Sequence, residues 1–119
     1  MSYTKFGEML RIKRIQNHEV MGDLADYLGV SVAFLSAVET GKKNIPDEWE
    51  EKLVEKYNFN EEERTNLKKA IIESKPQIKI NLVNANTQKR ELAVQFQRSF
   101  DNLDDEMVEG ILRLLNKEE

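Results

Sequence analysis

Lysine and arginine side chains gather in the first third of this sequence. Lys42 and Lys43 are adjacent, and Arg11, Lys13 and Arg14 lie within one helical turn of each other. Residues 1–45 hold six basic against five acidic residues, whereas residues 46–76 hold six against nine and residues 77–119 six against eight. Contacts to phosphate depend on local rather than total charge. A polyanionic partner is therefore expected to meet the first third of the chain, although the whole protein has a net charge of −4.

Residue types suited to catalysis or metal binding are scarce. The chain has no cysteine and a single histidine, His18, which is expected in an exposed turn. This composition excludes disulfides, thiolate catalysis and cysteine zinc sites, and it fits a reducing compartment such as the cytoplasm. The acidic residues from Asp104 to Glu109 lack the spacing of an EF-hand and favour a capped helix start. No glycine-rich phosphate loop, nucleophile elbow or HExxH motif occurs, so we expect no enzyme, metal or cofactor.

Apolar residues recur at helical spacing through most of the chain, which predicts an all-α fold. Five helices are expected in a first domain of residues 1–74, over residues 4–16, 21–28, 31–40, 47–57 and 61–74. Ser31 and Asn60 are types that cap helix starts, and Gly29 suits the positive φ of a helix end. Trp49 and Tyr57 are expected in the core.

The pattern changes after residue 76. Ile78, Ile80 and Leu82 alternate with polar residues, which indicates one short strand or an extended arm. A lone strand has no ladder partner within this chain. We therefore expect the segment 77–83 either to pair with its copy in a second subunit or to lie as an arm on its own domain.

Helical spacing returns in the last third. Two helices are expected, the first beginning at Asn86 or Thr87 and the second at Asp104. With the preceding segment they form a C-terminal extension, residues 75–119. We expect this extension to mediate dimerisation or to bind a protein partner.

The most specific pattern lies in residues 21–40. Ala25 is small where a second helix would pass closest, and Gly29 lies between the two expected helices. Apolar residues occupy the positions where crossing helices share a core, namely Leu24, Leu28, Val30, Leu35 and Val38. This is the pattern of a helix-turn-helix, in which the second helix is held out to enter the major groove of DNA.

At these residues the chain resembles the Xre/Cro family of bacterial and phage repressors. The resemblance covers roughly residues 4–74. Residues 6–11, Phe-Gly-Glu-Met-Leu-Arg, are similar to the family's first helix, and residues 39–46, Glu-Thr-Gly-Lys-Lys-Asn-Ile-Pro, to the exit from its recognition helix. Residues 49–59 are similar to its fourth helix. The resemblance implies a five-helix lambda-repressor-like domain that binds operator DNA, usually as a dimer, to control transcription.

The resemblance also implies which residues contact DNA. They are Ser31, Val32, Ala33, Ser36 and Ala37 on the recognition helix, with Lys42, Lys43 and Asn44 at its exit. The two lysines are expected to contact phosphate. Well-studied members have glutamine, arginine or asparagine at groove positions, whereas this chain offers mostly valine and alanine. Contacts to thymine methyl groups and the shape of the DNA are therefore expected to carry much of the discrimination. Glu39 is expected to be structural, paired with an arginine of the first helix.

We expect a sequence-specific transcriptional regulator, most simply a cytoplasmic repressor that binds double-stranded DNA as a homodimer. Two alternatives remain open. The protein could be an antitoxin that autoregulates its operon and neutralises a toxin through its tail. It could instead be a protein-interaction module that kept the fold and lost DNA binding, which the apolar recognition helix favours. The longest apolar run covers four residues, 32–35, so no membrane association is expected.

Overall fold

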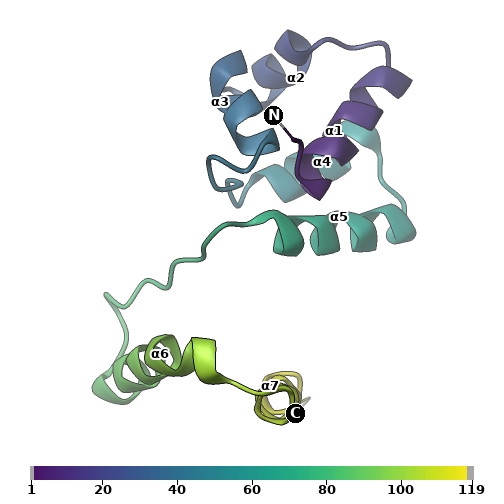
Figure 1. Ribbon diagram of the computed structural model, residues 1–119. Helices are drawn as coiled ribbons and strands as arrows, with labels where there is room; N and C mark the ends of the chain where they lie inside the picture. The colour runs from purple at the N-terminus through teal and green to yellow at the C-terminus, as the bar shows by residue number, and fades with distance from the viewer. Residues whose placement is uncertain (1, 118–119) are drawn as a thin grey trace. The chain divides into compact units, whose positions relative to one another are not determined.

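The computed structural model describes residues 2–117, and within that range it contains helices but no strand (Figure 1). The all-α class expected from the sequence is thus confirmed. The chain divides into an N-terminal unit, Met1–Ile78, and a C-terminal unit, Lys79–Glu119. The elements are α1 (Lys5–Gln16), α2 (Met21–Leu28), α3 (Val32–Glu39), α4 (Trp49–Tyr57), α5 (Glu61–Ser74), α6 (Thr87–Ser99), the 3-10 turn η1 (Phe100–Asn102) and α7 (Asp105–Leu115).

Side-chain caps fix where most of these helices begin. In each case a side-chain hydroxyl, amide or carboxylate oxygen accepts a hydrogen bond from the backbone N–H three residues later, which satisfies a donor that the first turn leaves without a partner. The capping residues are Thr4, Ser31, Asn60, Asn86 and Asp104, with donor–acceptor distances of 2.8–3.0 Å. Helix α4 begins two residues later than expected, because Trp49 N–H donates to the Pro46 carbonyl (3.1 Å) and closes a turn over residues 47–48.

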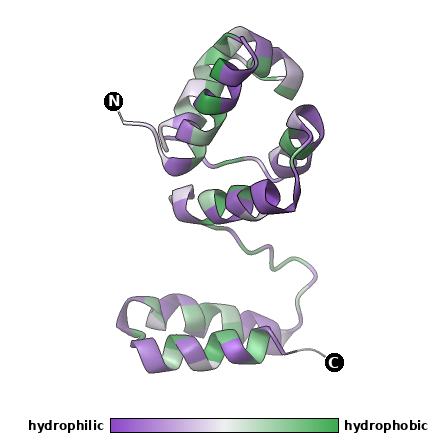
Figure 2. Ribbon diagram, turned by 90° about the vertical axis from the view of Figure 1, so that its right-hand side faces the viewer, coloured by the Kyte–Doolittle hydropathy of each residue, from purple (hydrophilic) through white to green (hydrophobic). Residues whose placement is uncertain are grey.

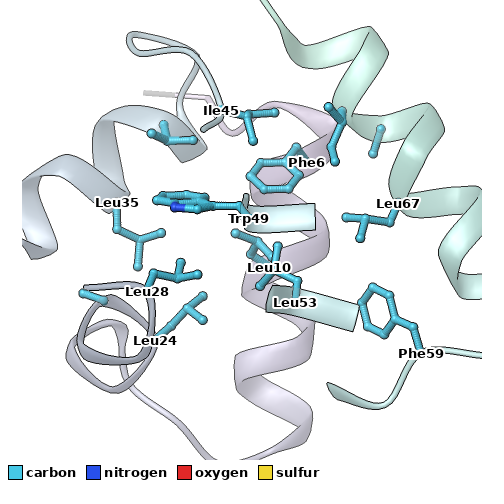
Figure 3. Close-up of a cluster of buried hydrophobic side chains, with 14 residues drawn as sticks. Phe6, Leu10, Leu24, Leu28, Leu35, Ile45, Trp49, Leu53, Phe59 and Leu67 are labelled. Carbon is cyan, nitrogen blue, oxygen red and sulfur yellow. The ribbon is translucent and has the colours of Figure 1, made fainter. Parts of the chain in front are cut away.

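The core of the N-terminal unit surrounds Trp49, which is buried as expected (Figure 3). Its ring stacks on Phe6, with centroids 6.4 Å apart, and meets Phe34 edge-on at 6.1 Å.

Tyr57 is only partly buried. Its hydroxyl donates to Glu19 (2.8 Å), and partial burial together with this bond raises the Tyr57 pKa. All five helices contribute to the buried cluster, which in the described residues consists of Phe6, Leu10, Leu24, Ala25, Leu28, Leu35, Val38, Ile45, Trp49, Leu53, Phe59, Leu67, Ala70 and Ile71.

The segment between α5 and α6 is extended and forms no strand within the single chain, and residues 77–83 are exposed apart from Leu82, so pairing with a second copy stays a prediction. Its alternating isoleucines have no ladder partner within the described chain. Side chains form hydrogen bonds with some of its backbone groups instead. The Arg90 guanidinium donates to the carbonyls of Leu82 (2.6 Å) and Ala85 (3.0 Å), and Val83 N–H donates to the Asn81 side chain (2.9 Å).

The C-terminal unit is a helical pair, α6 and α7, joined by η1. Figure 2 shows polar and apolar positions interleaved along both helices. No residue between 79 and 117 is buried. Considering all described helices of the chain, no single one is long and apolar enough to span a membrane.

Candidate nucleic-acid interface

Helices α2 and α3 meet at a sharp angle across a short turn. Three residues separate them, and the helices are bent by 98°. Gly29 has a φ of 73°, the left-handed conformation that glycine adopts at low cost, and Val30 N–H donates back to the Ala25 carbonyl at 3.0 Å. Leu28 of α2 and Leu35 of α3 converge on the core (Figure 3). This shared core fixes the direction in which α3 leaves the turn.

The outward side of α3 carries the five positions that the sequence assigned to DNA. Because Leu35 and Val38 are buried, residues about half a turn away from them around the helix face solvent. Ser31, Val32 and Ala33 are exposed, with Val32 at 47%, and Ser36 and Ala37 are partly exposed. None of the five is buried, and we call them together the α3 face: Ser31, Val32, Ala33, Ser36 and Ala37.

The turn after α3 holds two lysines at its end. Gly41 has a φ of 80°, and the chain then folds back so that the N–H groups of Lys42 and Lys43 both donate to the Ala37 carbonyl, at 2.8 and 3.2 Å. Both lysine side chains are exposed. Asn44 differs, because it is partly buried and its side-chain oxygen is buried without a hydrogen-bond partner among residues 2–117. That oxygen is turned away from any surface ligand.

A buried ion pair joins α1 to α3. The Arg14 guanidinium makes two contacts to the Glu39 carboxylate, one of them a 3.2 Å bond from Nη2 to Oε1. Glu39 is fully buried and Arg14 is 5% exposed. The expectation that Glu39 pairs with an arginine of the first helix is confirmed. Since Glu39 is the only acidic residue between positions 31 and 46, the α3 face and its exit turn present positive charge alone.

The basic residues of α1 do not all join the two exit lysines. Arg14 is buried in its ion pair with Glu39. Lys13 donates to Glu63 at 2.7 Å and lies over the Phe59 ring, and this hydrogen bond lowers the Glu63 pKa. Of Arg11, Lys13 and Arg14, only Arg11 is exposed, with its guanidinium 5.4 Å from the centre of the Tyr3 ring. Of the five expected cations, Arg11, Lys42 and Lys43 therefore remain exposed. The other two, Lys13 and Arg14, form ion pairs with residues more than twenty positions away in the sequence.

Gly7 is a positioning residue that the sequence did not reveal. It is buried in α1 directly against the end of α3, where an added Cβ would lie 2.8 Å from the Glu39 carbonyl carbon and closer still to its oxygen. The same carbonyl accepts hydrogen bonds from the N–H of Thr4 (3.0 Å) and from its hydroxyl (3.2 Å). Glycine is therefore required for α1 and α3 to approach this closely. In the sequence, the only sign of this close approach was a glycine next to Phe6 near the start of the first helix.

Comparisons of the chain with family models, with curated proteins and with solved structures found no match. Within residues 2–117, no three His, Cys, Asp or Glu side chains gather in a way that could hold a metal ion. The α3 face and its two lysines are therefore interpreted from their own geometry and charge.

Proposed function

We propose that this protein is a sequence-specific DNA-binding transcriptional regulator that docks α3 in the major groove. The observation that carries the proposal is the α3 face itself. It is exposed, it consists of short side chains, and it ends at Lys42 and Lys43. Burial of Glu39 against Arg14 removes the one carboxylate that would repel phosphate there.

The geometry of α2 and α3 supports this proposal. A three-residue turn containing glycine and a bend of 98° fall within the range of helix-turn-helix motifs. In such motifs the first residues of the second helix approach the base edges, and Ser31, Val32 and Ala33 occupy that position here. The resemblance to Xre/Cro repressors, and with it a lambda-repressor-like arrangement of the five helices, belongs to the same proposal. Repression is the mode of action that this resemblance favours.

The types of residue on the α3 face suggest how bases would be read. Val32 and Ala33 can pack methyl groups against the C5-methyl of thymine, while the Ser31 and Ser36 hydroxyls can bond to a base edge or a phosphate. The Ser31 oxygen already accepts the Phe34 N–H at 3.0 Å, so its hydroxyl hydrogen is free to donate outward. Short side chains also let a helix lie deep in the groove, where DNA shape contributes to specificity.

Binding to duplex DNA as a function of salt concentration tests the proposal. We expect the Lys42→Gln/Lys43→Gln variant to bind more weakly and to lose up to about two units of salt slope, one for each phosphate contact. The matched control is Lys68→Gln/Lys69→Gln, which removes the same charge from two adjacent exposed lysines of α5. Equal losses in the two variants would indicate only general attraction to DNA. An unchanged affinity and slope in the first variant would remove the exit lysines from the interface.

A second candidate is a protein-interaction module, and the apolar character of the α3 face favours it. Val32 is 47% exposed and Ala33 lies beside it, which would suit an apolar protein surface as well as thymine. The antitoxin alternative shares this logic, with the exposed apolar residues of the C-terminal unit as the contact for a toxin. Failure of the full chain to enrich any sequence from random duplexes would favour these alternatives over regulation through DNA.

A further inference from the structure

The basic side chains of the N-terminal unit fall into two groups. Most of them form ion pairs with carboxylates of the same unit. Those that form no ion pair within residues 2–117 are Arg11, Lys42, Lys43, Lys52 and Lys69. Lys52 lies on α4 and Lys69 on α5, whereas Arg11 lies on α1. Because the two exit lysines already belong to the proposed interface, Arg11 is the cation near α3 whose role is open.

Arg11 lies on the side of α1 that packs against the end of α3. It is four positions after Gly7 and three before Arg14, so the three residues share one side of the helix. Gly7 lies directly against the Glu39 backbone, and Arg14 pairs with the Glu39 carboxylate. Since Glu39 is the last residue of α3, Arg11 borders the end of α3 at which the exit turn begins.

The N-terminal segment is fixed at the same place. Both the N–H and the hydroxyl of Thr4 donate to the Glu39 carbonyl, at 3.0 and 3.2 Å. The Thr4 methyl group lies 3.0 Å from the position that a Cβ on Gly41 would occupy, so Thr4 also adjoins the exit turn. Tyr3 directly precedes it, and the Arg11 guanidinium lies over the Tyr3 ring, 5.4 Å from its centre. We call these two residues the Tyr3–Arg11 pair.

The contact with the ring leaves the hydrogen-bonding groups of Arg11 available. It engages the charge of the guanidinium and none of its five N–H donors. Arg11 is exposed, and Glu8, three positions before it on α1, forms no ion pair with it. A planar fork of N–H donors matches two oxygens of one phosphate group. Because the ring already restricts the side chain, less conformational entropy is lost when the guanidinium binds.

We propose that the Tyr3–Arg11 pair is a phosphate-binding site of the DNA interface, separate from the exit lysines. Arg11 contacts a phosphodiester of the DNA backbone, and Tyr3 is the positioning residue that holds its guanidinium. The site extends the interface from α3 onto α1 and the N-terminal segment. It rests on the proposed function, because it requires that α3 docks on duplex DNA. Phosphate contacts fix the register of a protein on DNA without reading bases, so the site should act equally on all sequences.

The charge of the site is tested by duplex binding as a function of salt concentration. We expect Arg11→Gln to bind about tenfold more weakly and to lose about one unit of salt slope, on selected and random duplexes alike. The matched control is Lys69→Gln, which removes one exposed cation without an ion pair from α5 and should change both quantities less. Tyr3 and Arg11 are exposed, so their variants should keep the wild-type urea midpoint of Trp49 fluorescence.

The role of the ring is tested by two substitutions that leave every charge in place. Tyr3→Leu should weaken binding about two- to fivefold with an unchanged salt slope, because the guanidinium loses its support but not its charge. Tyr3→Phe keeps the ring and should bind like the wild type. Equal losses in the two variants, or no loss in Tyr3→Leu, would overturn Tyr3 as the residue that positions Arg11.

Failure of this site can be told from failure of the proposed function. If Lys42→Gln/Lys43→Gln weakens binding but Arg11→Gln matches the Lys69→Gln control, the Tyr3–Arg11 site is overturned and the proposed function stands. If the full chain binds no duplex, the proposed function fails and the site fails with it. Losses in both variants that exceed their controls, together with the rescue by Tyr3→Phe, support the site.

Discussion

The N-terminal unit turns its large apolar residues inward, whereas the C-terminal unit leaves its own exposed. Trp49 and Leu35 are at most 1% exposed, but Leu114 and Leu115 are 75% exposed, although all four belong to well-capped or amphipathic helices. The five helices of the first unit surround a common core, whereas no residue between 79 and 117 is buried. The difference shows that a helix can form from local signals without its apolar side chains becoming buried. In the first unit these side chains form a core, whereas in the second they are exposed or only partly buried.

Electrostatics divide the molecule in the same way. The N-terminal unit contains the buried pair Arg14–Glu39 and an ion pair between Lys56 and Glu19 that is 18% exposed on each side. The C-terminal unit, through residue 117, contains none. Ion pairs therefore join helices within the first unit, whereas the described residues of the second unit contain no such pair.

The largest effect is expected where the first unit's core holds a charge. Glu39→Gln leaves the Arg14 guanidinium buried without its counter-charge, which should lower the free energy of unfolding by about 3–5 kcal/mol. Trp49 is the only tryptophan, so its fluorescence in a urea titration reports this unit selectively. Glu48→Gln, at an exposed carboxylate, is the control and should stay within about 0.5 kcal/mol of the wild type. A loss no larger than the control's would show that the buried pair does not hold α1 to α3.

A smaller loss is expected from Gly7→Ala, which introduces a methyl group where α1 meets the Glu39 carbonyl. The carbonyl is held by two hydrogen bonds from Thr4 and cannot withdraw easily, so we expect a loss of about 1–3 kcal/mol in the same titration. Gly22→Ala is the matched control in α2, where an added Cβ meets nothing within 4 Å. That control should be neutral or should gain up to about 1 kcal/mol from helix propensity. Equal behaviour of the two alanines would contradict the close approach.

The smallest effect, and one of opposite sign, is expected from Gly110→Ala in the second unit. An added Cβ at Gly110 meets nothing within 4 Å, and helical spacing puts the residue on the side of α7 opposite Val108, Leu112 and Leu115. We expect α7 to gain up to about 1 kcal/mol of helix stability, visible as a higher midpoint for loss of helical circular dichroism. A lower midpoint would contradict the open surroundings of Gly110.

The parts of the fold that could be predicted from the sequence are those fixed within a few residues. Ser31, Asn60 and Asp104 cap their helices because the acceptor and the N–H that it satisfies are three positions apart. An ion pair between Glu39 and an arginine of the first helix was also expected, and the structure shows that the arginine is Arg14. The five positions of the α3 face came from the resemblance to the Xre/Cro family, and the structure leaves none of them buried.

The parts that could not be predicted depend on residues distant in the sequence. Nothing local to Lys13 indicates that Glu63 will bind it, and nothing local to Gly7 indicates the Glu39 carbonyl beside it. The alternation of Ile78, Ile80 and Leu82 suggested a strand, but alternation describes only one side of a ladder. Without a partner strand among the described residues, the segment is extended in the single chain, and pairing with a second copy stays a prediction.

The central claim is that the α3 face and the two exit lysines contact DNA. The most direct measurement is a titration of isotopically labelled full chain with duplexes recovered by selection from random sequence, followed by NMR of the backbone amides. The account predicts that the largest shifts occur at residues 31–37 and at Lys42 and Lys43, with little change along the exposed side of α5. Recovery of no duplex, or shifts that leave residues 31–37 unperturbed, would contradict it.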